Sequence, residues 1–89
     1  MPYKIRIAPE AHKEIKALSG YVRSPALKII QSLSKDARPS FAKELRGKST
    51  MYRIRLLDKW RIVYQIKDDE KVVVILRVRR KEDIDYDSL

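Results

Sequence analysis

Arginine side chains recur at every second position in the middle of the chain. Arg53 and Arg55 alternate with apolar residues, and Arg61 follows after a short turn. Guanidinium groups bind phosphate oxygens in a fixed, two-pronged geometry, and positive charge around a reacting phosphate stabilises the charge that develops there. Residues of this type at this spacing are therefore suited to bind an anionic ligand.

The pairing of the two strands that carry these residues decides whether the arginines share a face. Facing residues of an antiparallel hairpin point to the same side of the sheet. A three-residue loop pairs Arg55 with Arg61 and Leu56 with Trp60, which separates the arginines from the apolar residues. A two-residue loop would set Arg55 opposite an isoleucine and mix the faces, so the burial pattern predicts the longer loop. The other predicted pairs are Ile54 with Ile62 and Tyr52 with Tyr64.

The next hairpin extends the basic face to a third strand. Pairing Ile66 with Val72 predicts that Arg61 lies opposite Arg77. Like charges that face each other across strands cost about 0.2–1 kcal/mol per pair, and an anionic ligand would relieve that repulsion. A solvated face of long side chains is the plainer alternative, and we favour the ligand. The predicted face has no acidic residue from these strands and carries Arg53, Arg55, Arg61, Arg77 and Arg79.

The periodicity of the apolar residues predicts the elements that position this face. Residues 3–7 alternate as a strand, and helical spacing predicts one helix from Pro9 to a stop at Gly20 and a second that begins at Ser24-Pro25. Residues 36–49 indicate a connector, with room for one helical turn over 41–45, and strands follow at 52–56, 60–66 and 72–78. We expect an α+β fold in the order β-α-α-β-β-β, with an α-helical hairpin packed on one face of a three-stranded antiparallel meander. Under the helices we expect Tyr3, Tyr52, Trp60 and Tyr64, with a solvated tail over residues 82–87.

Composition limits the partners and the chemistry. The 89 residues indicate a single domain over 1–89, and 21 Lys and Arg against 12 Asp and Glu give a net charge of +9. Such a charge attracts nucleic acid, an anionic membrane surface or an acidic protein. The absence of cysteine excludes disulfides, zinc–thiolate sites and cysteine nucleophiles, and suits a reducing cytoplasm. We expect no signal peptide, since residues 1–6 hold no apolar run, and no membrane span, since the longest apolar run is Val72 to Leu76.

Across nearly its whole length the chain resembles RelE-type toxins of the RelE/ParE toxin–antitoxin superfamily. No single motif carries the resemblance, which depends on the order and spacing of several segments. These are Tyr3–Ile5, the helix over Ala11–Leu18, Lys43–Gly47, Tyr52–Leu56, Trp60–Ile66, and Val72–Arg80 with the basic tail and Tyr86.

The resemblance implies a ribosome-dependent endoribonuclease that cuts messenger RNA in the A site without a metal or other cofactor. Attack by the ribose 2′-hydroxyl would replace metal-activated water. By position, Arg53 and Arg55 would hold the RNA backbone and help to activate the hydroxyl, and Arg61 would stabilise the transition state. The leaving oxygen would be protonated by Lys81, or by Arg80 with a small shift. Tyr86 would stack on a base, although packing is an equally good interpretation of that residue.

Other basic residues and the source of the general base stay open. Arginine cannot lose its proton at neutral pH, so Arg55 acts electrostatically, or Tyr86 or a water takes the proton. The only histidine, His12, is expected at the surface. Further RNA contacts are expected from Arg77, Arg79, Arg80, Lys43, Arg46 and Lys48, although the last three also suit a plain connector.

The implied partners are a RelB-like cognate antitoxin, the ribosome and messenger RNA, in the cytoplasm and away from membranes. We expect the antitoxin to cover the domain with an acidic segment that folds on binding. Two alternatives stay open. One is a ParE-like inhibitor of DNA gyrase, which a long C-terminal helix would favour. The other is a non-catalytic RNA-binding module or decayed toxin.

Overall fold

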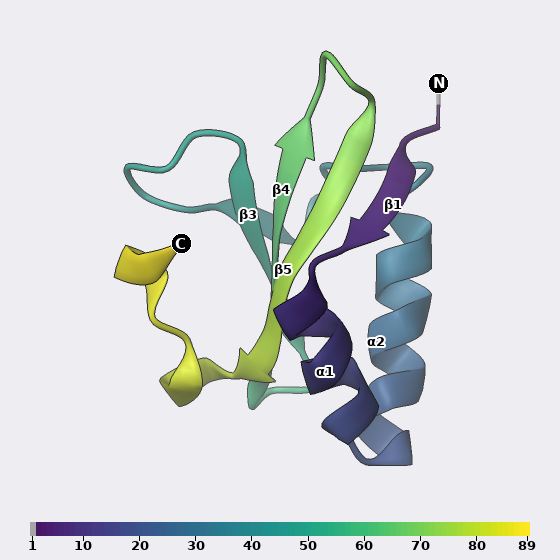
Figure 1. Ribbon diagram of the computed structural model, residues 1–89, viewed down its shortest axis with the longest axis vertical. Helices are drawn as coiled ribbons and strands as arrows, with labels where there is room; N and C mark the ends of the chain where they lie inside the picture. The colour runs from purple at the N-terminus through teal and green to yellow at the C-terminus, as the bar shows by residue number, and fades with distance from the viewer. Residues whose placement is uncertain (1) are drawn as a thin grey trace.

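The computed structural model describes residues 2–89 and folds them as a mixed sheet covered on one face by two helices (Figure 1). The elements follow one another as β1 (Lys4–Ile7), α1 (Pro9–Ala17), α2 (Gly20–Ser32), β2 (Ala42–Glu44), β3 (Met51–Leu56), β4 (Trp60–Lys67) and β5 (Val72–Arg80). Two short 3-10 turns, Lys81–Asp83 and Tyr86–Ser88, complete the chain. Neither helix in residues 2–89 is both long and apolar enough to cross a bilayer.

The sheet has five strands, in the order β1-β5-β4-β3-β2, where the sequence predicted a three-stranded meander. β1 pairs with β5 in parallel, and the other neighbours are antiparallel. The connector expected over residues 36–49 contains β2 instead of a helical turn. β2 is an edge strand of three residues, of which Lys43 and Glu44 are exposed. So short a segment shows no alternation of apolar residues from which a strand could be predicted.

The helical hairpin is confirmed, but its second helix begins earlier than predicted. α2 starts at Gly20, which was expected to end the first helix, and the supposed start at Pro25 lies inside it. Val22 is fully buried against the sheet, which gives the first turn of α2 its own share of the core. The guanidinium of Arg23 also donates to the carbonyl oxygens of Ile15 (3.2 Å) and Lys16 (3.1 Å) at the end of α1. These contacts hold the start of α2 against α1. They help to keep the first turn helical although Pro25 has no N–H to donate within the helix.

The four aromatic residues predicted under the helices lie in the core or against it, with Tyr64 buried and Tyr3, Tyr52 and Trp60 partly buried. Tyr64 is fully buried and its hydroxyl donates to the carbonyl oxygen of Ala37 at 2.9 Å. Burial raises the pKa of Tyr64 above its ordinary value. Its ring stacks on that of Tyr52 with 5.7 Å between centroids, while Trp60 meets Tyr21 edge-on at 6.4 Å. Ring contacts thus join α2 to β4 and β3 to β4.

The register of the β3–β4 hairpin is as predicted, with all four expected pairs: Leu56–Trp60, Arg55–Arg61, Ile54–Ile62 and Tyr52–Tyr64. The prediction for β4 and β5 is wrong by one residue, because Ile66 pairs with Val73 and not with Val72. A bulge at Leu76 then restores the alternation, so that Arg61 lies opposite Arg79 and not Arg77. β5 is apolar on both faces, which left its register without a signal in the sequence.

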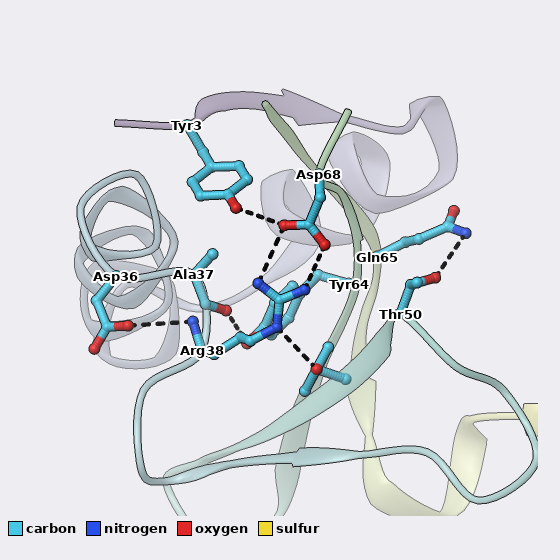
Figure 2. A network of polar contacts seen from close by, with 9 residues as sticks. Tyr3, Asp36, Ala37, Arg38, Thr50, Tyr64, Gln65 and Asp68 are labelled. Carbon is cyan, nitrogen blue, oxygen red and sulfur yellow. Dashed lines mark hydrogen bonds and ion pairs between the residues drawn. The ribbon is translucent and has the colours of Figure 1, made fainter. Parts of the chain in front are cut away.

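Arg38 joins four distant parts of the chain at one end of the sheet (Figure 2). Its guanidinium donates to both carboxylate oxygens of Asp68, at 3.2 and 2.7 Å, and to the hydroxyl of Tyr52 at 3.1 Å. The hydroxyl of Tyr3 donates to the same carboxylate at 2.6 Å. Arg38, aided by Tyr3, lowers the pKa of Asp68 from 3.8 to about 2. The β4–β5 turn is thereby tied to β1, to β3 and to the segment after α2.

The lowered pKa predicts an acid-dependent loss of stability. The folded state favours ionised Asp68, so this contribution is present above pH 3.8 and disappears as the pH falls toward 2. We expect Asp68→Asn to lower the free energy of unfolding at pH 7 and to flatten its decline between pH 4 and 2. Urea unfolding across this pH range measures both effects. Asp69→Asn in the same turn is the control, and an acid decline of equal steepness in Asp68→Asn and wild type would contradict the assignment.

Candidate nucleic-acid interface

Five basic side chains from separate parts of the fold converge on one cleft of about 430 Å³. The cleft lies on the face of β3 and β4 opposite the helices, and none of the residues in 2–89 that line it is acidic. It brings together four of the five residues that the sequence marked as catalytic. Its lining consists of Phe41, Lys43, Arg53, Arg55, Arg61 and Lys81. A ring of cations without a carboxylate repels metal cations and attracts polyanions.

The sheet register places the basic residues in two rows. Lys43 of β2 pairs with Arg53 of β3, and Arg55 of β3 pairs with Arg61 of β4. Neighbouring strands lie about 4.8 Å apart, so each row sets two cations close together. Such pairs are unfavourable by about 0.2–1 kcal/mol each without an anion between them. The geometry is therefore suited to a chain of phosphates.

Among the described residues that line the cleft, Arg61 is the one buried charge. Its side chain is 7% exposed and lies on the cleft side of β4, away from the helices. One of its terminal nitrogens donates to the carbonyl oxygens of Asp58 and Trp60, both at 2.8 Å. The turn that supplies the first carbonyl has Leu57 and Asp58 at φ 49° and 34°. The guanidinium is thereby held in place before any ligand arrives, which is what electrostatic stabilisation of a transition state requires.

At the end of β5 the sequence left Lys81 and Arg80 as alternatives, and the structure separates them. Lys81 lines the cleft, and its backbone N–H donates to the carbonyl oxygen of Lys59 at 2.8 Å. The guanidinium of Arg80 lies over the ring of Trp60, 5.1 Å from its centroid. Arg80 lines an adjoining hollow with Arg55 and Arg61, so it stays close to the cleft without facing into it.

Arg77 and Arg79 are engaged by acidic residues of α1. Arg77 lies 3.7 Å from the carboxylate of Glu10, and the guanidinium of Arg79 bonds to Glu14 and to the carbonyl oxygen of Asp83. Glu14 also accepts the backbone N–H of Val78 at 3.0 Å. The three strands carry no acidic residue, as predicted, but α1 brings carboxylates to the basic side chains of β5. Inspection of the strands alone missed these carboxylates because they come from a helix.

Tyr86 lies outside the cleft, in a second hollow that shares Arg53 with it. This hollow of about 320 Å³ is also lined by Leu45, Arg46 and Lys48, together with Glu44 and Asp87. The predicted solvated tail is wrong in part, because apolar side chains of the C-terminal segment pack in a small cluster with residues of the sheet. This small cluster contains Leu45, Met51, Val63, Leu76, Ile84, Tyr86 and Leu89. Tyr86 therefore has a packing role, and it stands at the far side of Arg53 from the cleft.

Phe41 is the lining residue that the sequence did not single out. It is the chain's only phenylalanine, and 55% of its surface is exposed. Its place in an apparent connector gave no reason to set it beside the arginines. The sequence feature that could have indicated its role is an aromatic residue two positions before Lys43, in a segment rich in charged residues.

Comparison with known proteins places the chain in a family. The sequence model of one protein family, the ParE toxin of the type II toxin–antitoxin system parDE, matches residues 5–84. The chain belongs to the RelE/ParE superfamily of type II toxins. No curated protein sequence matches this toxin significantly.

Solved structures place the toxin beside RelE in particular. It is 30% identical to a double-arginine mutant of Escherichia coli RelE in the free state, with a TM-score of 0.80 over 92% of this chain and 86% of that one. It is 25% identical to a chain of the Mycobacterium tuberculosis RelBE2 toxin–antitoxin complex, with a TM-score of 0.77 over 91% and 100%. The archaeal RelE–RelB complex from Pyrococcus horikoshii, at 24% identity and a TM-score of 0.77 over 94% and 100%, shares the fold.

Glu14 provides a test of how α1 closes the edge of the sheet. We expect Glu14→Ala to lower the free energy of unfolding by about 1–3 kcal/mol, because the N–H of Val78 loses its acceptor at the strand edge. Glu14→Gln keeps an acceptor oxygen and should lose less. Urea unfolding measures both, with Glu10→Ala as the matched control on the same helix. Equal stability of Glu14→Ala and Glu10→Ala would show that the edge contact contributes nothing.

Proposed function

We propose that this toxin is a ribosome-dependent endoribonuclease that cuts messenger RNA without a metal and so inhibits translation. The observation that carries the proposal is the cleft in which Arg53, Arg55, Arg61 and Lys81 converge. A phosphodiester in this cleft would meet positive charge from three sides. The 2′-hydroxyl of ribose supplies the nucleophile, which makes RNA and not DNA the substrate.

In the proposed reaction the 2′-oxygen attacks the adjacent phosphorus. A new 2′-O–P bond forms and the P–O5′ bond breaks, which leaves a 2′,3′-cyclic phosphate and a 5′-hydroxyl. The proton of the 2′-hydroxyl leaves to water, since the arginines of the cleft keep their protons. Lys81 supplies a proton to the departing 5′-oxygen. Water and the lysine restore the original protonation states afterwards.

The arginines divide the electrostatic work. Arg53 and Arg55 are exposed. They hold the RNA backbone at the reacting phosphate, where their charge favours ionisation of the 2′-hydroxyl. Arg61, fixed by two carbonyl oxygens, faces the oxygens that gain charge in the transition state. Further along the strand of RNA, Tyr86 contacts a base from the neighbouring hollow. The two hollows share Arg53, which gives the RNA a continuous basic path past Arg46 and Lys48.

An antitoxin of the RelB type is the proposed protein partner. The similar M. tuberculosis, P. horikoshii and E. coli toxins are known in RelE–RelB or RelBE complexes. An acidic segment of such a partner would neutralise the cleft, and it would compete with RNA for the same cations. The proposed site of action is the cytoplasm, where ribosomes translate messenger RNA.

A ParE-like inhibitor of DNA gyrase is the second candidate, because the matching family model is that of a ParE toxin. That function needs a protein-binding surface and no reacting phosphate. Loss of single cations in the cleft would then leave toxicity unchanged.

Induction of the toxin in bacteria tests the nuclease. We expect growth arrest and new message 5′ ends at codons occupied by ribosomes. Arg55→Gln and Arg61→Gln should each lower the cleavage rate by about 10²–10³-fold, since each removes charge from the transition state. Lys28→Gln, on the exposed face of α2, is the matched control for a lost cation.

Three outcomes would contradict the nuclease. Arrest with intact messages and broken DNA favours the gyrase inhibitor. Binding of RNA without cleavage by the wild type favours a non-catalytic module. Unchanged message 5′ ends with Arg55→Gln would show that the cleft takes no part in cleavage. Because Arg55 is exposed, we expect this variant to fold normally.

A further inference from the structure

We propose that Phe41 is the base-stacking platform of the cleft, on which the base beside the phosphate held by Arg55 and Arg61 rests. The inference depends on the proposed function for its substrate, single-stranded RNA. The contact between Phe41 and this base lies at the edge of the sheet and is separate from the base contact expected of Tyr86.

The fold places the Phe41 ring at one end of the row of arginines. β2 pairs with β3 through Ala42–Ile54 and Lys43–Arg53, and Phe41 comes directly before Ala42. Phe41 and Arg55 line the same cleft. Arg55 in turn pairs with Arg61. Phe41 and the Arg55–Arg61 pair therefore border one space.

The position of Phe41 is built into the backbone. The N–H of Ala42 donates to the carbonyl oxygen of Pro39 at 3.0 Å, which closes a turn with Phe41 at its third position. The turn leads directly into β2, so the sheet holds the residue that follows the ring. Lys43, two residues further along, lines the same cleft.

Core packing does not account for the exposed ring. Within residues 2–89, Phe41 belongs to neither of the two apolar clusters, and more than half of its surface is exposed. Tyr21 is also exposed, but its ring meets Trp60 edge-on, and Tyr86 packs in the smaller cluster. Phe41 differs from both because its exposed ring lines a cleft with five cations.

An aromatic ring among cations is the arrangement by which proteins hold single-stranded nucleic acid. The cations bind the phosphates, and the face of the ring stacks on a base. The binding free energy gained from stacking depends little on which base it is. A phenylalanine has no polar group to select one base. We therefore infer that Phe41 positions the nucleotide without reading its sequence.

A short oligoribonucleotide with 2-aminopurine beside a 2′-O-methylated nucleotide tests the contact without cleavage. Stacking quenches the fluorescence of 2-aminopurine. We expect wild type to quench it, and Phe41→Leu to bind about 5- to 150-fold more weakly with the quenching lost. Phe41→Trp, which keeps an aromatic face, should restore both. Tyr21→Leu is the matched control for a lost exposed ring and should equal wild type.

The outcomes separate this inference from the proposed function. Equal binding and quenching by Phe41→Leu and wild type would overturn the inference whatever the messages show, as would a wild type that fails to quench. Quenching that depends on Phe41, in a toxin that cuts no messages on ribosomes, would support the contact and overturn the nuclease. If messages are cut, a cleavage rate of Phe41→Leu equal to that of wild type at limiting ribosome concentration would overturn the positioning role.

Discussion

The side-chain alternation of the β3–β4 hairpin is the constraint on which the rest of this toxin depends. With Arg55 opposite Arg61, the isoleucines of the same strands are nearly or fully buried beneath the helices and the arginines face the other way. A slip of one residue would turn every side chain to the wrong face. The register that builds the core therefore also builds the cleft, and neither can change without the other.

The fold sorts its arginines by their partners. Arg77 and Arg79 meet carboxylates of α1, where they help to close the edge of β5 that β1 does not reach. Arg38 pairs with Asp68 and ties together the opposite end of the sheet. The residues of the cleft instead face one another, and buried Arg61 is held by backbone carbonyl oxygens that leave its charge in place. Positive charge is thus neutralised where it supports the fold and concentrated where a phosphate would bind.

The two hollows give the proposed RNA path a direction across the sheet. Phe41 stands at the edge beside Arg55, Tyr86 stands on the tail side, and Arg53 borders both spaces. The C-terminal turns form part of this surface because Tyr86 and its neighbours pack on β3 and β4. A partner that moved only the second turn, Tyr86–Ser88, would alter the hollow that Tyr86 lines and leave the residues that line the cleft in place.

The sequence by itself determined the helix pair, the β3–β4 register and the common face of Arg53, Arg55 and Arg61, because alternation with buried residues allows one pairing. Only the tertiary structure decided the bulge in β5, since a strand apolar on both faces favours no register. It alone also revealed β2, the carboxylates that engage Arg77 and Arg79, and the place of Phe41 beside the cations. Each of these depends on contacts between segments far apart in the chain, which local spacing does not encode.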